Sequence, residues 1–191
     1  MKPIELNFLL PTSASPIERA RAKVTVVTAL AIGAAMLAVV LFWIVTFTLE
    51  DIETVILTIV LLLLMAGVIF LVKRGRVQLG AWILTLLMIF LNLSNMTWYG
   101  VSTTSSAGYI IPILLALFGI GSGAGLGVTL FGCASVFGIS LLASTGQIQT
   151  EIPYVESHLT FDAPALALIY LVVYFISIAW VKSAQSAFTE K

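Results

Sequence analysis

The chain has 191 residues, of which 60% are hydrophobic and 9% are charged, and its mean hydropathy is +1.13. A soluble domain carries about 25% charged residues, so the composition excludes one and predicts a single polytopic, all-α membrane domain. Nine Lys and Arg residues balance nine Asp and Glu residues, and without a basic surplus nucleic acid is not an expected partner.

The first predicted element, residues 1–23, is a cytoplasmic tail followed by a lead-in helix. Ser15, Pro16 and Glu18 have the order of a capping box, in which Ser15 accepts the N–H of Glu18 and the Glu18 carboxylate reaches back. A cleaved signal peptide is not expected, because the apolar stretch that follows is longer than the roughly 7–15 residues of a signal-peptide core.

Six apolar segments follow, and together they predict a six-helix transmembrane domain over residues 24–181. A span needs about 20 apolar residues, and Gly, Ser and Thr gather between the third, fourth and fifth segments as in turns. The predicted spans are Val24–Thr48, Ile52–Val72, Val77–Thr97, Ser105–Gly121, Ala124–Ser144 and Ala163–Val181.

The charges between these segments predict an orientation. Lys and Arg lie before the first span, between the second and third, and after the sixth, whereas the interior acids lie at 50–53 and 151–162. Cytoplasmic loops retain Lys and Arg, so we expect a multi-pass protein of the cell inner membrane with both termini in the cytoplasm. No Gly or Pro follows Pro164, which predicts that the last helix continues as a cytoplasmic exit helix over 182–191.

Small residues mark two surfaces for close helix packing. Ala31 and Ala35 lie one turn apart on the first span, and Gly119, Gly123 and Gly127 repeat at four-residue steps around the fourth and fifth. Such spacing lets helices approach closely, either within the bundle or against a partner subunit.

Polar side chains near the end of the third span are the candidate ligand site. Asn92, Asn95 and Tyr99 share one helix face, and Tyr109 follows beyond the next turn. They predict either a pocket for a small ligand that opens outward, or interhelical hydrogen bonding beside an aromatic belt, and the second interpretation is favoured.

The sequence predicts no catalytic residues, no metal site and no cofactor. No Asp, Glu, Lys, Arg or His lies at membrane depth, where ion-coupled transporters need such residues. Cys133 is the only cysteine, and the only histidine, His158, lies in an acidic loop where it is expected to be solvated. We therefore expect the chain not to be an enzyme.

Residues Leu79 to Gln147 resemble the membrane input region of bacterial sensor histidine kinases. The resemblance lies in Gly100–Tyr109, in Ile110-Ile111-Pro112-Ile113-Leu114-Leu115-Ala116 and in the glycine turn after them. It implies a sensory module that passes a stimulus through its last helix to a cytoplasmic output domain or partner protein, in a homodimer within the lipid bilayer. Since such regions continue into a kinase and this sequence ends at Lys191, we expect an excised input domain or a separate partner.

Two other functions fit the same pattern. The substrate-binding subunits of energy-coupling-factor vitamin transporters are similar in size and span number, and their docking face would correspond to Ala31 and Ala35. The third alternative is a scaffold subunit of a membrane complex, without catalytic groups.

Overall fold

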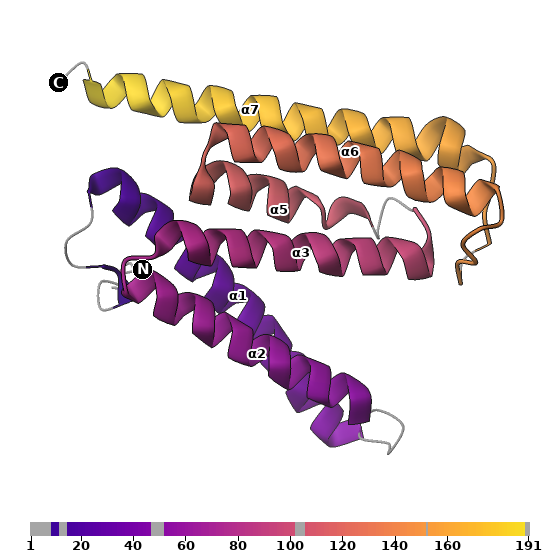
Figure 1. The fold of residues 1–191 in the computed structure, drawn as a ribbon, viewed down its shortest axis with the longest axis horizontal. Coiled ribbons are helices and arrows are strands. Elements are labelled where there is room, and N and C mark those ends of the chain that lie inside the picture. The colour runs from indigo at the N-terminus through magenta and orange to yellow at the C-terminus, as the bar shows by residue number, and fades with distance from the viewer. Residues whose placement is uncertain (1–8, 12–14, 47–51, 102–105, 152, 190–191) are drawn as a thin grey trace. The chain divides into compact units, whose positions relative to one another are not determined.

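The computed structural model describes residues 9–11, 15–46, 52–101, 106–151 and 153–189. All regular structure in these residues is helical, which confirms the all-α fold class (Figure 1). The chain divides into two compact units, Met1–Leu84 and Thr85–Lys191. The elements are α1 (Pro16–Thr46), α2 (Ile52–Lys73), α3 (Val77–Tyr99), α5 (Ile110–Leu115), the π-helix η3 (Ala116–Ile120), α6 (Ser122–Ser144), the π-helix η4 (His158–Asp162) and α7 (Ala163–Thr189).

Among the described residues, five helical segments are long and apolar enough to cross a membrane, as in a multi-pass membrane protein. They are Pro16–Phe42, Val55–Lys73, Val77–Tyr99, Ser122–Ser144 and His158–Ser183. The predicted fourth span differs, because its apolar helix covers only Ile110–Ile120. At about 1.5 Å per residue, a helix of this length covers roughly half of a hydrocarbon core about 30 Å thick. The end at Gly121 agrees with the prediction, and the difference lies at the start, where a turn at Gly108 and Tyr109 precedes Ile110; the predicted first residue, 105, lies outside the described residues.

Unit 1 is built on the pairing of α1 with α2. Ala22 and Val26 of α1 pack against Val72 of α2 and Val77 of α3 in a small buried cluster. The turn from α2 to α3 passes through Gly75 at φ +82°, a left-handed conformation that other residues rarely adopt.

The predicted capping box begins α1. Ser15 N donates to Glu18 Oε2 at 3.1 Å, and Glu18 N donates to Ser15 Oγ at 3.3 Å. This reciprocal pairing satisfies backbone donors that a helix leaves free at its start, and it confirms the interpretation of the sequence.

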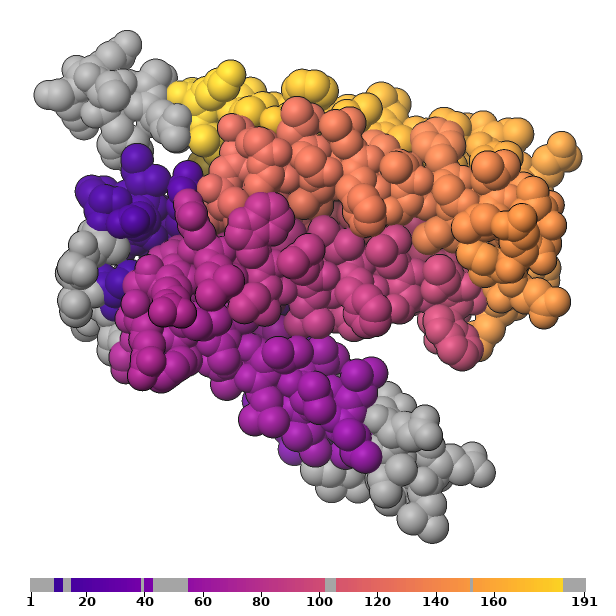
Figure 2. Space-filling model, in the orientation of Figure 1, coloured from indigo at the N-terminus to yellow at the C-terminus, as the bar shows by residue number. Residues whose placement is uncertain are grey.

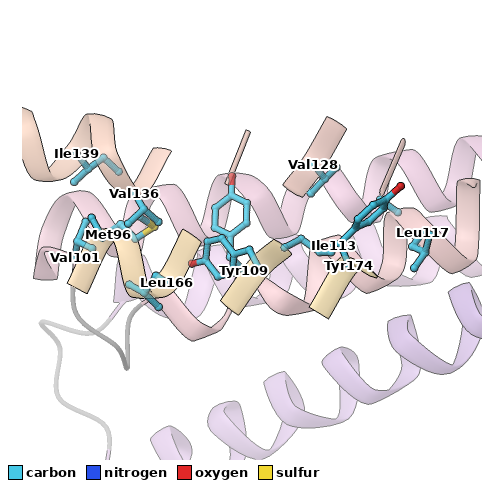
Figure 3. Close-up of a cluster of buried hydrophobic side chains, with 13 residues drawn as sticks. Met96, Val101, Tyr109, Ile113, Leu117, Val128, Val136, Ile139, Leu166 and Tyr174 are labelled. Carbon is cyan, nitrogen blue, oxygen red and sulfur yellow. The ribbon is translucent and has the colours of Figure 1, made fainter. Parts of the chain in front are cut away.

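Unit 2 has the larger core. Helices α6 and α7 pack against each other, as Figures 1 and 2 show side by side, and α5 packs against both. Met96 of α3 belongs to the same buried cluster. Figure 3 shows the buried side chains that these elements contribute. The cluster comprises Met96, Val101, Tyr109, Ile113, Ala116, Leu117, Val128, Val136, Ile139, Ala163, Leu166, Tyr170 and Tyr174.

Two glycines of α6 lie in tight contacts. A Cβ atom at Gly125 would lie 2.9 Å from Leu117 Cβ, and one at Gly132 would lie 2.8 Å from a ring carbon of Tyr109. Gly123 and Gly127, which the four-residue spacing selects, have nothing within 4 Å of such an atom. The close contacts of α6 within unit 2 are thus made at Gly125 and Gly132, and packing of Gly123 and Gly127 against a partner stays a prediction.

The other predicted packing positions differ in burial. Gly119 is buried in η3. Ala31 and Ala35 of α1 are exposed. Packing of these two alanines against a partner therefore stays a prediction.

Candidate functional site

Two tyrosines of α7 hold the two ends of the short helix formed by α5 and η3. Tyr170 Oη donates to the Ser106 carbonyl at 2.6 Å, before the start of α5, and Tyr174 Oη donates to the Ser122 carbonyl at 3.3 Å, just after η3. Because the two tyrosines lie one turn apart on α7, a single stretch of that helix contacts both ends. We call Ser106, Ser122, Tyr170 and Tyr174 the tyrosine clamp.

The π-helix η3 is part of this arrangement. Gly121 N donates to Ala116 O at 2.9 Å, a five-residue step that widens the last turn. The chain then turns at Gly121 with φ +150°, and Ser122 begins α6. The wide turn thus leads directly to the carbonyl that Tyr174 binds.

Tyr109 packs beside the clamp. Its ring centroid lies 5.7 Å from that of Tyr170, and both rings approach Gly132 of α6. Tyr109, which Figure 3 labels, and Tyr170 are both fully buried, so the start of α5 meets α6 and α7 through two aromatic rings and one glycine. Cys133, the next residue of α6, lies with its Sγ 3.7 Å from the Ala167 carbonyl of α7.

Three buried hydroxyls in unit 2 have no hydrogen-bond partner among the described residues. They are Ser106 Oγ, Tyr109 Oη and Ser140 Oγ. A buried hydroxyl without a partner costs about 1–3 kcal/mol.

The predicted ligand residues differ in burial and in contacts. Asn92 is buried, its Nδ2 donates to the Met88 carbonyl of its own helix at 2.8 Å, and its Oδ1 lies against Gly108. Asn95 is partly buried, and Tyr99 is exposed. Tyr109 belongs to the core beside Tyr170. A ligand role for all four remains a prediction.

Within unit 2, the end of α3 and the residues after it contact the chain that follows α6, where Gly100 lies beside Thr150. Glu151 N donates to the Trp98 carbonyl at 2.8 Å. His158 Nε2 lies 3.9 Å from Asp162 Oδ2, and its ring stands edge-on to Tyr154. No three metal-ligating side chains gather anywhere in the described part of the chain.

The interpretation of the sequence missed Tyr170, Tyr174 and Gly132. A signal for the tyrosines was present, because a buried tyrosine hydroxyl usually finds a hydrogen-bond partner, and these two lie at a four-residue spacing within an apolar span. The role of Gly132 was hidden, since nothing in the sequence separates it from the other glycines of α6.

Comparisons with known proteins do not assign the chain to a family. No protein-family model matches the chain, and neither a curated protein nor a solved structure does. The class follows from the fold alone: an all-helical chain with several long apolar helices, as in multi-pass membrane proteins.

Proposed function

We propose that this chain is a membrane-embedded sensory input module that relays a stimulus through α7 to a cytoplasmic output domain or partner protein. The observation that supports the proposal is the continuity of α7. It runs without a break from Ala163 to Thr189, and its first half carries both clamp tyrosines. A displacement that begins at the clamp can therefore travel along one rigid element.

The proposed mechanism is a shift between two arrangements of the clamp. A stimulus that moves the segment before α5 displaces the Ser106 carbonyl and breaks its hydrogen bond with Tyr170, so the clamp is closed in one arrangement and open in the other. Helix α7 then slides or rotates relative to α6, the kind of small helix shift that switching proteins use. The stimulus acts only to the extent that it stabilises one arrangement over the other.

The proposal includes the topology that the charges predict. Both termini lie in the cytoplasm of a bacterial cell, the apolar helix Ile110–Ile120 with its flanking turns provides the fourth crossing, and α7 leaves the membrane near Lys182. Two copies of the chain form the signalling unit.

Helical phase tests this function. The chain is fused to a histidine kinase output, and one, two or four residues are inserted after Lys182. Each inserted residue rotates the output by about 100°, since a helix has 3.6 residues per turn. We expect kinase activity to change with one and two insertions and to return near its starting value with four. Activity that is indifferent to all three insertions would contradict the proposal.

The transport alternative has one observation in its favour. Ala31, Ala34, Ala35 and Ala38 are all exposed on α1, so a partner subunit can approach its backbone closely. A transport subunit does not need a rigid exit helix. It should therefore keep its activity when residues 183–191 are replaced by a flexible Gly-Ser segment, whereas an input module should lose control of its output.

A further inference from the structure

A pocket of about 400 Å³ lies in unit 1, at the end where α2 turns into α3. Its walls come from three places: Glu18 and Arg21 of α1, Gly75 and Arg76 of the turn, and the first turn of α3 from Val77 to Leu79. Pockets of roughly 300–1,000 Å³ are the usual size of small-ligand sites.

The two arginines of this pocket have no acidic partner among the residues that the structure describes. Neither Arg21 nor Arg76 forms an ion pair within the described residues. Glu18, the one acid in the wall, accepts hydrogen bonds at its Oε2 from Ser15 N at 3.1 Å and Ser15 Oγ at 3.2 Å, and the two arginines outweigh its single negative charge. The pocket therefore presents two guanidinium groups to a ligand, and each can bind a phosphate through two hydrogen bonds.

An apolar surface continues from the pocket along α3. Leu79 lines the pocket and is 46% exposed, and Trp82, three residues further along the helix, is 41% exposed. Tryptophan is enriched where lipid headgroups meet acyl chains. A ligand that fits both surfaces carries a negative group at one end and a hydrocarbon chain at the other.

We propose that this pocket binds the phosphate of an anionic phospholipid, with the acyl chains along Leu79 and Trp82. Other basic residues lie around the pocket without lining it: Arg19 and Lys23 lie on α1, Lys73 ends α2 and Arg74 follows it. Arg74 contacts Phe70 rather than the pocket: its guanidinium lies 4.4 Å from the centre of the Phe70 ring. The inference requires that unit 1 is inserted in a membrane, and it is independent of signalling.

Lipid-dependent thermal unfolding of the purified full chain tests the proposal. The chain in a neutral detergent receives phosphatidylglycerol, phosphatidylcholine or inorganic phosphate in separate titrations. We expect phosphatidylglycerol alone to raise the melting temperature. The variant Arg21→Gln/Arg76→Gln should need about ten times more phosphatidylglycerol for half of the shift, since it loses charge-assisted hydrogen bonds to the phosphate.

The matched control removes the same charge outside the pocket. Arg19→Gln/Arg74→Gln loses two arginines from the same helix and the same turn, and neither residue lines the pocket. Its titration should stay within about twofold of the unaltered chain, because contacts with the phosphate are retained. If the first double variant does not fold, the exposed residue Arg76 gives the same comparison as Arg76→Gln against Arg74→Gln.

Three results would overturn the proposal. If the pocket and control variants need equal increases in phosphatidylglycerol for half of the shift, the lipid is attracted by net charge and no specific site exists. Equal stabilisation by inorganic phosphate would show a site for a soluble anion, and equal stabilisation by phosphatidylcholine would show that the negative headgroup is not recognised.

Discussion

The two units of this chain use apolar side chains in different ways. In unit 1, helices α1 and α2 expose large residues such as Leu41 and Leu63, and the cluster between them is small. In unit 2, 13 residues form one buried cluster that includes three tyrosines. In lipid, exposed apolar side chains gain nothing by turning inward, so association of helices depends on close packing and on hydrogen bonds. Unit 2 has both, so we expect single substitutions in unit 2 to change the free energy of unfolding more than those in unit 1.

The largest contrast is expected between two leucines. Leu166 of α7 is buried in unit 2, and Leu63 of α2 in unit 1 is 67% exposed. Leu166→Ala should lower the free energy of unfolding by about 2–4 kcal/mol, because it leaves a cavity in a packed cluster. Leu63→Ala should change it by less than about 0.5 kcal/mol. Unfolding in mixed micelles of neutral detergent and dodecyl sulfate measures both, and similar losses would remove the contrast between the units.

Two glycines give the next contrast. A methyl group at Gly132 of α6 meets the buried Tyr109 ring, whereas one at Gly67 of α2 meets nothing within 4 Å. Gly132→Ala should destabilise the chain by about 1–3 kcal/mol through overpacking. Gly67→Ala should be neutral or should stabilise by about 0.5–1 kcal/mol, since alanine favours a helix. The same unfolding assay measures both variants. If Gly132→Ala stabilises the chain, Tyr109 does not pack on α6.

A smaller effect separates the two clamp hydrogen bonds. Tyr170 Oη lies 2.6 Å from its carbonyl acceptor, and Tyr174 Oη lies 3.3 Å from its own. Tyr170→Phe should cost about 0.6–2 kcal/mol, as hydrogen bonds between membrane helices do. Tyr174→Phe should cost less, because its bond is longer. A larger loss in Tyr174→Phe would reverse the assigned order of the two contacts.

The sequence predicted those features of the fold that depend on composition and local spacing. The long apolar helices and the capping box at Ser15 and Glu18 are confirmed because each depends on a short continuous stretch. The helix after Pro164 continues to Thr189 for the same reason. The fourth helix ends at the glycine turn as predicted, but its apolar stretch begins at Ile110, because Gly108 and Tyr109 form a turn that the sequence did not reveal.

The candidate site was harder to predict, because its residues come from separate helices. In a membrane protein the lipid-facing and core-facing sides of a helix are both apolar, so periodicity does not identify the inner face. Gly123 and Gly127 fit a packing pattern as well as Gly125 and Gly132 do, and only the positions of Leu117 and Tyr109 distinguish them. The sequence likewise does not reveal the hydrogen-bond partners of Tyr170 and Tyr174, because they lie 64 and 52 residues away along the chain.

The central claim is that the tyrosine clamp couples the ends of α5 to the exit helix, and the output of a kinase fusion measures it most directly. Tyr170→Phe/Tyr174→Phe removes both hydrogen bonds and keeps both rings. At about 0.6 kcal/mol for each bond, the balance between the two arrangements should shift by about five- to tenfold, and kinase activity should change accordingly. Tyr154→Phe, outside the clamp, should change activity by less than about twofold. A double variant that inserts and folds normally, yet keeps the unaltered activity, would contradict the claim.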